Sequence, residues 1–93
     1  MMDDRDLRTA VRALVMREFY VADPAALRNE QSLLLSGIVD STGVIELTAL
    51  LVDAFGIAIE PEEISPRNLD TIDRIVAFVA SKRAPGPRTA ADR

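Results

Sequence analysis

The chain of 93 residues contains no cysteine and no histidine. The absence of cysteine excludes disulfide bonds, thiolate zinc sites and thiol nucleophiles. The absence of histidine removes the commonest general base and the commonest metal ligand, and with them histidine-dependent catalytic triads and zinc hydrolases. Any thiol chemistry must therefore use an imported group. We expect a protein that is not an enzyme and that has no metal site.

Long apolar stretches are also missing. The longest apolar run, residues 75–80, is far too short to span a bilayer. The first six residues are acidic and polar, whereas a signal peptide would begin with basic residues followed by apolar ones. These observations predict a cytoplasmic protein with no membrane partner.

Basic residues are scarce in the middle of the chain. The net charge is −4, but residues 40–73 contain eight acidic residues and a single basic one, Arg67, which makes this segment −7. A surface that binds the phosphate backbone of a nucleic acid needs the opposite sign. The charge pattern therefore disfavours nucleic acid as a partner and favours a basic protein surface.

Hydrophobic periodicity predicts three longer helices and no strand. Apolar residues recur at the spacing of an amphipathic helix over residues 4–20 and again over residues 69–82, the latter with Asn68 as a candidate N-cap. The best-defined helix runs from about residue 40 to 55, because Gly56 suits the left-handed position that follows a helix. We therefore expect an all-α fold.

The connections between these helices differ in length. The first, residues 21–40, is longer than connections in compact domains usually are. Its apolar cluster predicts that it packs onto the core; the cluster consists of Leu33, Leu34, Leu35, Ile38 and Val39. Further along, Pro61 can start a short helix over residues 61–64, which Pro66 stops.

The last ten residues, 84–93, differ from the rest because they have no apolar pattern. We expect them to form a disordered tail after a single helical domain, residues 1–83. A domain of this size builds one small core and has little room for a deep catalytic pocket. Its function should therefore lie at the surface.

The helix predicted over residues 40–55 has two apolar sides. With about 100° per residue, the core face collects Val44, Leu47, Leu51, Ala54 and Phe55. A second, milder apolar strip descends directly below Ser41 through Ile45, Thr48, Ala49 and Val52. Two carboxylates, Glu46 and Asp53, border this strip. The long connection covers the strip or a partner protein binds it, and the periodicity leaves both open.

Ser41 stands at the predicted start of the same helix. A serine or aspartate before an apolar periodic run is most often only a helix cap. No capping box follows here, because the third residue after Asp40 is Gly43 and the third after Ser41 is Val44. Unpaired N–H groups at a helix N-terminus also stabilise an attached phosphate, so a functional role for the hydroxyl is open as well.

Four short motifs follow one another along the chain: Gly-Ile-Val-Asp-Ser-Thr-Gly-Val-Ile-Glu-Leu at 37–47, Phe-Gly-Ile at 55–57, Pro-Glu-Glu-Ile at 61–64 and Asn-Leu-Asp-Thr-Ile at 68–72. In this order, over residues 4–81, the sequence resembles the acyl carrier protein family. The resemblance implies a four-helix bundle with three longer helices, one short helix and a long first loop. It also implies that Ser41 receives 4′-phosphopantetheine from coenzyme A. The thiol of this arm would hold an acyl or aminoacyl group as a thioester and would supply the sulfhydryl that the chain lacks.

The resemblance also implies partners and further site residues. Asp40 would help a phosphopantetheinyl transferase and its Mg²⁺ to recognise the attachment site. The second helix would dock on basic patches of partner enzymes through Thr42, Ile45, Glu46, Ala49 and Asp53, and the acidic surface would be extended by Glu62 and Glu63. Besides the transferase, these partners would be an adenylating enzyme that activates the acyl or amino acid and the downstream enzymes that act on the tethered group.

Two positions depart from the usual pattern of the family. Thr42 replaces the leucine or methionine that usually follows the serine, and Val52 stands where carriers of fatty-acid synthesis tend to have an acid. The Asp-Ser-Thr-Gly form looks more like discrete carriers of specialised metabolism, so we expect a role in the biosynthesis of secondary metabolites. The alternative is a helical protein-interaction module without a prosthetic group. An enzyme that uses carboxylates such as Asp40 and Glu46 is disfavoured, because no histidine or metal-ligand cluster accompanies them.

Overall fold

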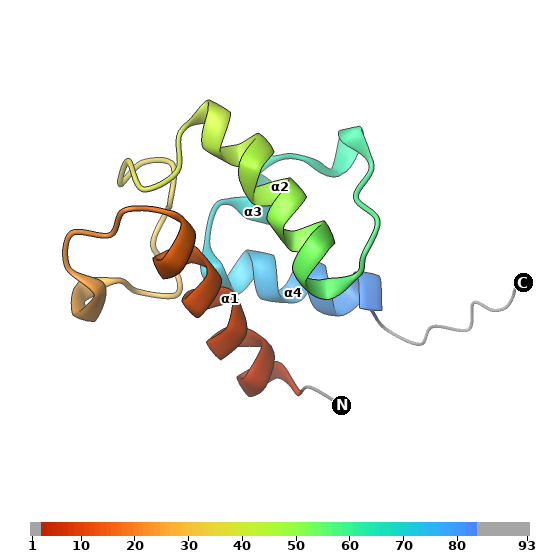
Figure 1. Ribbon diagram of the computed structural model, residues 1–93, viewed down its shortest axis with the longest axis horizontal. Helices are drawn as coiled ribbons and strands as arrows, with labels where there is room; N and C mark the ends of the chain where they lie inside the picture. Colours follow the sequence, from red (N-terminus) through yellow and green to blue (C-terminus); the bar gives the residue numbers. More distant parts are fainter. Residues whose placement is uncertain (1–2, 84–93) are drawn as a thin grey trace, which may run out of the picture.

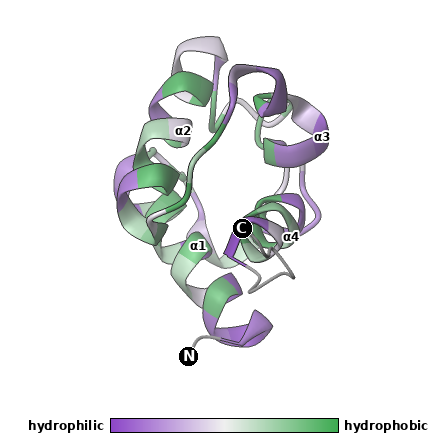
Figure 2. Ribbon diagram, turned by 90° about the vertical axis from the view of Figure 1, so that its right-hand side faces the viewer, coloured by the Kyte–Doolittle hydropathy of each residue, from purple (hydrophilic) through white to green (hydrophobic). Residues whose placement is uncertain are grey.

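The computed structural model describes residues 3–83, so the predicted tail, residues 84–93, lies outside the described residues (Figure 1). Within this range the chain forms helices and no strand; the elements are α1 (Asp4–Glu18), η1 (Pro24–Ala26), α2 (Ser41–Phe55), η2 (Pro61–Glu63), α3 (Pro66–Leu69) and α4 (Ile72–Arg83), where η denotes a 3₁₀ helix. The predicted all-α bundle is therefore confirmed. Figure 2 shows α2 facing α3 and α4 across the core, with α1 below them.

The first helix has the amphipathic character that its spacing predicts. Its buried residues are Leu7, Val11, Leu14 and Val15. Asp3 is its N-cap and accepts a hydrogen bond from the Asp6 N–H at 2.9 Å. The helix ends at Glu18, two residues earlier than predicted, because the backbone at Phe19 is extended. It packs mainly against α4.

The second helix has the ends that the sequence predicts. Gly56 follows it in the left-handed conformation, with φ of +66°, and donates its N–H to the Val52 carbonyl at 2.9 Å. Of the predicted core face, Leu47 and Leu51 are fully buried. Ala54 is exposed, which corrects the prediction: the last turn of α2 is less covered than its middle.

The region between α2 and α4 differs from the prediction in two ways. Pro66 does not only end a helix; it is the first residue of α3, a position that suits proline. The predicted helix over 69–82 starts later, at Ile72, and Thr71 caps it by accepting the Arg74 N–H at 2.9 Å. Asn68 is therefore not its N-cap; its amide donates to the Glu63 carbonyl at 2.8 Å.

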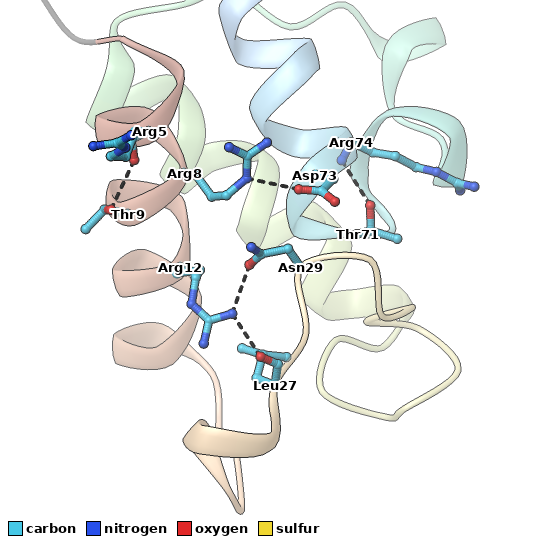
Figure 3. A network of polar contacts seen from close by, with 9 residues as sticks. All are labelled: Arg5, Arg8, Thr9, Arg12, Leu27, Asn29, Thr71, Asp73 and Arg74. Atoms are coloured by element: carbon cyan, nitrogen blue, oxygen red, sulfur yellow. Dashed lines mark hydrogen bonds and ion pairs between the residues drawn. The ribbon is translucent and has the colours of Figure 1, made fainter.

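The long first connection packs onto the core, as predicted: Leu33 and Val39 of the predicted cluster are buried, and so is Leu27, which the prediction did not include. Arg12 of α1 donates to the Leu27 carbonyl and to Asn29 Oδ1, both at 2.9 Å, and Arg8 of α1 pairs with Asp73 of α4 at 3.0 Å (Figure 3). The Asp73 N–H donates to the Asn29 carbonyl at 3.0 Å and so holds the connection against the start of α4. No helix within residues 3–83 has the length and apolar content needed to cross a membrane.

Candidate functional site

Ser41 is the first residue of α2, and Asp40, not Ser41, caps the helix. Asp40 Oδ1 accepts the Gly43 N–H at 2.6 Å, and the Asp40 carbonyl accepts the Val44 N–H at 2.9 Å. Ser41 is exposed, and its hydroxyl has no hydrogen-bond partner among residues 3–83. The hydroxyl is therefore free for chemistry that a cap could not perform.

The backbone around this hydroxyl suits a negatively charged group. The first N–H groups of a helix have no acceptor within the helix. Asp40 satisfies those of Gly43 and Val44, which leaves the N–H groups of Ser41 and Thr42 without a partner in the described part of the chain. Two spare donors and the positive end of the helix dipole would stabilise a phosphate ester on the Ser41 oxygen.

The second carboxylate oxygen of Asp40 is available to bind another group. Only Oδ1 is used in capping, and Oδ2 has no hydrogen-bond partner within residues 3–83. The side chain is exposed beside the Ser41 hydroxyl. Such an oxygen is a ligand that Mg²⁺ accepts when other ligands come from a bound substrate. No group of three or more acidic residues that could hold a metal ion occurs in the described range.

Gly43 explains why the helix can start so close to its neighbours. A Cβ at this position would lie 3.2 Å from the Phe19 ring, the Val39 side chain and Asp40 Oδ1. Such a distance is tighter than ordinary van der Waals contact. The glycine therefore lets the first turn of α2 sit against the end of α1 while Asp40 keeps its capping bond.

A groove of about 240 Å³ opens beside Ser41. Its lining is mostly apolar and comes from the long connection, from α2 and from the segment that leads into α3; the residues are Leu34, Val39, Ser41, Val44, Ile64, Ser65, Pro66 and Leu69. A chain attached to the Ser41 oxygen could thus lie along apolar side chains. A larger cavity, of about 320 Å³, lies among residues 20–27 and 31–38 and touches none of the predicted site residues.

The apolar strip of α2 is uncovered. The predicted docking residues Thr42, Ile45, Glu46, Ala49 and Asp53 are all exposed, as is Val52. Ile45 is 62% exposed, although it is a large apolar residue. In Figure 2, α2 is green or pale along most of its length, whereas α3 is mostly purple. The long connection therefore leaves these positions of α2 open to solvent.

The two glutamates of η2 have different surroundings. Glu62 is exposed. The Glu63 carboxylate accepts hydrogen bonds from Lys82 Nζ at 2.8 and 3.1 Å and from the Glu60 N–H at 2.9 Å. The Lys82 ammonium, together with the Glu60 N–H, holds the pKa of Glu63 below its ordinary value of 4.5. Glu63 thus ties η2 to α4, and Glu62 is the outward-facing acid of the pair.

Leu35 is a surface residue that the sequence reasoning missed. The apolar cluster of the long connection predicts that it packs onto the core, but Leu35 is 91% exposed. Its neighbour Leu33 is fully buried, and Leu34 lies in the groove beside Ser41. In a helix or a strand, three consecutive side chains point in different directions. The run of three leucines was therefore a sign that the whole cluster does not face the core from one side.

Comparison with protein families gives a match that extends over most of the described residues. A protein-family model described as a phosphopantetheine attachment site matches residues 9–79. The matched region begins within α1, ends within α4 and includes Asp40 and Ser41. Comparison with curated proteins gives no match.

Proposed function

Because the matched region spans well over half of the sequence, the chain belongs to the family of acyl carrier proteins that bear phosphopantetheine, and from this premise we propose that Ser41 is the attachment residue. Members of this family carry 4′-phosphopantetheine covalently on a serine. The chain is therefore a carrier protein whose partners are a phosphopantetheinyl transferase and enzymes that act on the tethered group.

The observation that carries the assignment to Ser41 is its free, exposed hydroxyl beside two spare N–H donors. In the transfer reaction this hydroxyl oxygen would form a bond to the phosphorus that bears the pantetheine in coenzyme A. The phosphoanhydride bond would break, adenosine 3′,5′-bisphosphate would leave, and the hydroxyl proton would pass to a base of the transferase or to water. The N–H groups of Ser41 and Thr42 would stabilise the negative charge on the phosphate oxygens.

Asp40 has a proposed role in the same step. Its free Oδ2 would contribute one ligand to a Mg²⁺ ion that the transferase and coenzyme A hold. Once bound, the arm supplies a thiol that forms a thioester with the carried group. The groove beside Ser41, with Leu34, Ile64 and Leu69 in its lining, offers apolar contacts to a chain attached there.

We further propose that the strip of exposed residues on α2 is the docking surface for partner enzymes. This docking strip consists of Thr42, Ile45, Glu46, Ala49 and Asp53. Its apolar middle and acidic border suit a partner with an apolar contact inside a basic rim. Glu62 extends the acidic border, whereas the charge of Glu63 is largely neutralised by Lys82.

The finer assignment is a discrete carrier of specialised metabolism that is loaded by an adenylating enzyme with an amino acid or a small acyl group. It is supported by Thr42, which departs from the leucine or methionine usual in the family, and by Val52, which leaves the docking face of α2 less charged than that of carriers of fatty-acid synthesis; both residues are exposed. We propose that the carrier domain comprises residues 1–83 and that it performs no catalysis itself.

The test is the intact mass of the protein after incubation with a broad-specificity transferase, coenzyme A and Mg²⁺. We expect the mass of one phosphopantetheinyl group to be added to the wild type and to Thr9→Ala, and none to be added to Ser41→Ala. Thr9→Ala is the matched control, because it removes an exposed hydroxyl on α1, outside the proposed site. An unchanged wild-type mass would favour the alternative, a protein-interaction module without a prosthetic group.

A further inference from the structure

Leu35 is the most exposed of the large apolar side chains in the described range, at 91%. Hydrogen bonds order the turn that carries it. The Leu35 N–H donates to Ser32 Oγ at 3.0 Å, the Ser36 N–H to the Ser32 carbonyl at 3.1 Å and the Gly37 N–H to the Leu34 carbonyl at 3.2 Å. The turn over residues 32–37 thus presents an apolar side chain to solvent from a defined backbone.

The same turn is anchored to the rest of the fold at Asp70. The Asp70 carboxylate accepts Ser32 Oγ at 2.8 and 2.9 Å and the Leu34 N–H at 3.0 Å, and the Asp70 carbonyl accepts the Leu33 N–H at 2.7 Å. The position of Leu35 relative to α3 and α4 is therefore set by four hydrogen bonds from its neighbours.

This turn lies next to Ser41. Leu34 and Ser41 line the same groove, and Figure 1 shows the turn beside the N-terminal end of α2. On α2 itself, Ile45 lies one helical turn after Ser41 and is 62% exposed. Each of the two elements that meet at Ser41 therefore exposes a large apolar side chain close to it, Leu35 on the turn and Ile45 on α2.

We propose that Leu35 is an apolar anchor for the phosphopantetheinyl transferase, an inference that rests on the proposed function. An enzyme that forms a bond to the Ser41 oxygen must bring its active site to that atom, so its surface must cover the residues around it. An enzyme that acts on the distal thiol of the arm has no such requirement. The transferase is thus the partner whose footprint must come closest to Leu35.

The distribution of charge around Ser41 indicates what the surface of the transferase should look like. Residues 32–39 carry no charged side chain, whereas α2 exposes Glu46 and Asp53. A complementary surface has an apolar pocket for Leu35 next to basic residues that meet α2. Leu35 therefore adds an apolar contact on the turn that precedes Ser41, whereas the docking strip lies on the helix that follows it.

The experiment measures kcat/KM for phosphopantetheinyl transfer to four proteins: the wild type, Leu35→Asp, Leu35→Met and Met16→Asp. Leu35→Asp should lower kcat/KM about tenfold, mainly through KM, as the loss of an apolar anchor does at other interfaces. Leu35→Met keeps an apolar side chain and should stay within about twofold of the wild type. Met16→Asp places the same charge on α1, at a partly exposed apolar residue outside the groove, and should leave kcat/KM unchanged.

A binding measurement separates this role from catalysis. The apo variants are titrated with the transferase without coenzyme A, and the Kd of Leu35→Asp should rise by about the same factor as its KM. Unaltered KM and Kd in Leu35→Asp would overturn the proposal, and so would a defect confined to the later loading enzyme. Lack of modification in the wild type would instead overturn the proposed function. Circular dichroism of each variant checks that it is folded.

Discussion

Asp40 and Ser41 are adjacent residues with separate tasks. Asp40 accepts the N–H of Gly43, the third residue of α2, with one oxygen at 2.6 Å, and the serine hydroxyl has no partner among the described residues. A serine that capped the helix itself would have its oxygen occupied as a hydrogen-bond acceptor. The residue pair Asp-Ser therefore provides a helix start and a free nucleophile in two consecutive positions.

Substitution of Asp40 tests these tasks separately. Asn caps a helix about as well as Asp, so Asp40→Asn should keep the stability of the wild type within a few tenths of a kcal/mol, whereas Asp40→Ala should lose about 1 kcal/mol. Both variants lack the carboxylate proposed to bind Mg²⁺ and should be modified more slowly. Urea denaturation measures the stability and intact mass over time measures the modification. Modification of Asp40→Asn at the wild-type rate would show that the charge is not needed.

At the scale of the element, α2 has two apolar sides, of which one is buried in the core and the other is exposed. Leu47 and Leu51 are fully buried, so Leu47→Ala and Leu51→Ala should each lower the free energy of unfolding by about 2 to 5 kcal/mol. Ile45→Ala, on the docking strip, should change it by at most about 0.5 kcal/mol. Urea denaturation of the three variants checks this contrast. Equal losses would mean that the faces of α2 are assigned incorrectly.

Charge reversal at the acidic border of the docking strip should slow the reaction with partner enzymes and leave the stability of the fold nearly unchanged. Glu46→Lys and Asp53→Lys replace exposed carboxylates, so each should change stability by only about 0.5 kcal/mol. Loading by the partner enzyme should become slower, because the basic rim would meet a positive charge. Asp23→Lys, at an exposed acid in the long connection, is the control and should be loaded normally. Normal loading of all three would place the docking surface elsewhere.

At the scale of the whole molecule, residues far apart in sequence hold the site in place. Asp70 accepts hydrogen bonds from the turn before Ser41, and the Asp73 N–H donates to the Asn29 carbonyl. The Asp73 carboxylate pairs with Arg8 (Figure 3). The junction between α3 and α4 thus orders the long connection that leads to the serine. The site depends on this junction although no residue of it is proposed to take part in the reaction.

Asp70→Ala tests this dependence. Hydrogen bonds to a charged group contribute about 1.5 to 3 kcal/mol when partly buried, so the variant should lose stability within that range. Its backbone amides over residues 32–37 should exchange hydrogen faster than those of the wild type. Hydrogen-exchange mass spectrometry measures this exchange. Asp53→Ala, which removes an exposed acid, should leave exchange over residues 32–37 unchanged, and equal exchange in Asp70→Ala would contradict the anchoring role.

The ion pair between η2 and α4 predicts a pH dependence of stability. Because Lys82 lowers the pKa of Glu63 in the folded protein, the pair stabilises the fold above the ordinary pKa of 4.5 and this contribution is lost as the pH falls through the lowered pKa. The stability difference between the wild type and Glu63→Gln should thus be constant near neutral pH and shrink below about pH 4.5. Urea denaturation at several pH values measures it. The difference for Glu62→Gln, at the exposed neighbour, should show no such change.

Local signals in the sequence were sufficient where one residue determines the backbone. Asp40 and Gly56 mark the two ends of α2, because a cap and a left-handed glycine act on the nearest turn alone. The break between α3 and α4 gave no such signal. Leu69 and Ile72 are both buried and keep helical spacing across the break, so periodicity started the last helix at residue 69, three residues too early.

Composition, periodicity and motif order were enough to establish an all-helical carrier that must import its thiol, since each depends on residue type and spacing along the chain. Packing between distant segments decided the rest: that the strip below Ser41 is uncovered, that Glu63 turns to Lys82 and that Leu35 points outwards. These outcomes depend on which distant residues pack next to each side chain in the folded protein. The spacing of residues along one helix carries no information on such neighbours, because hydrogen-bonded partners such as Glu63 and Lys82 or Ser32 and Asp70 lie 19 to 38 residues apart in the chain.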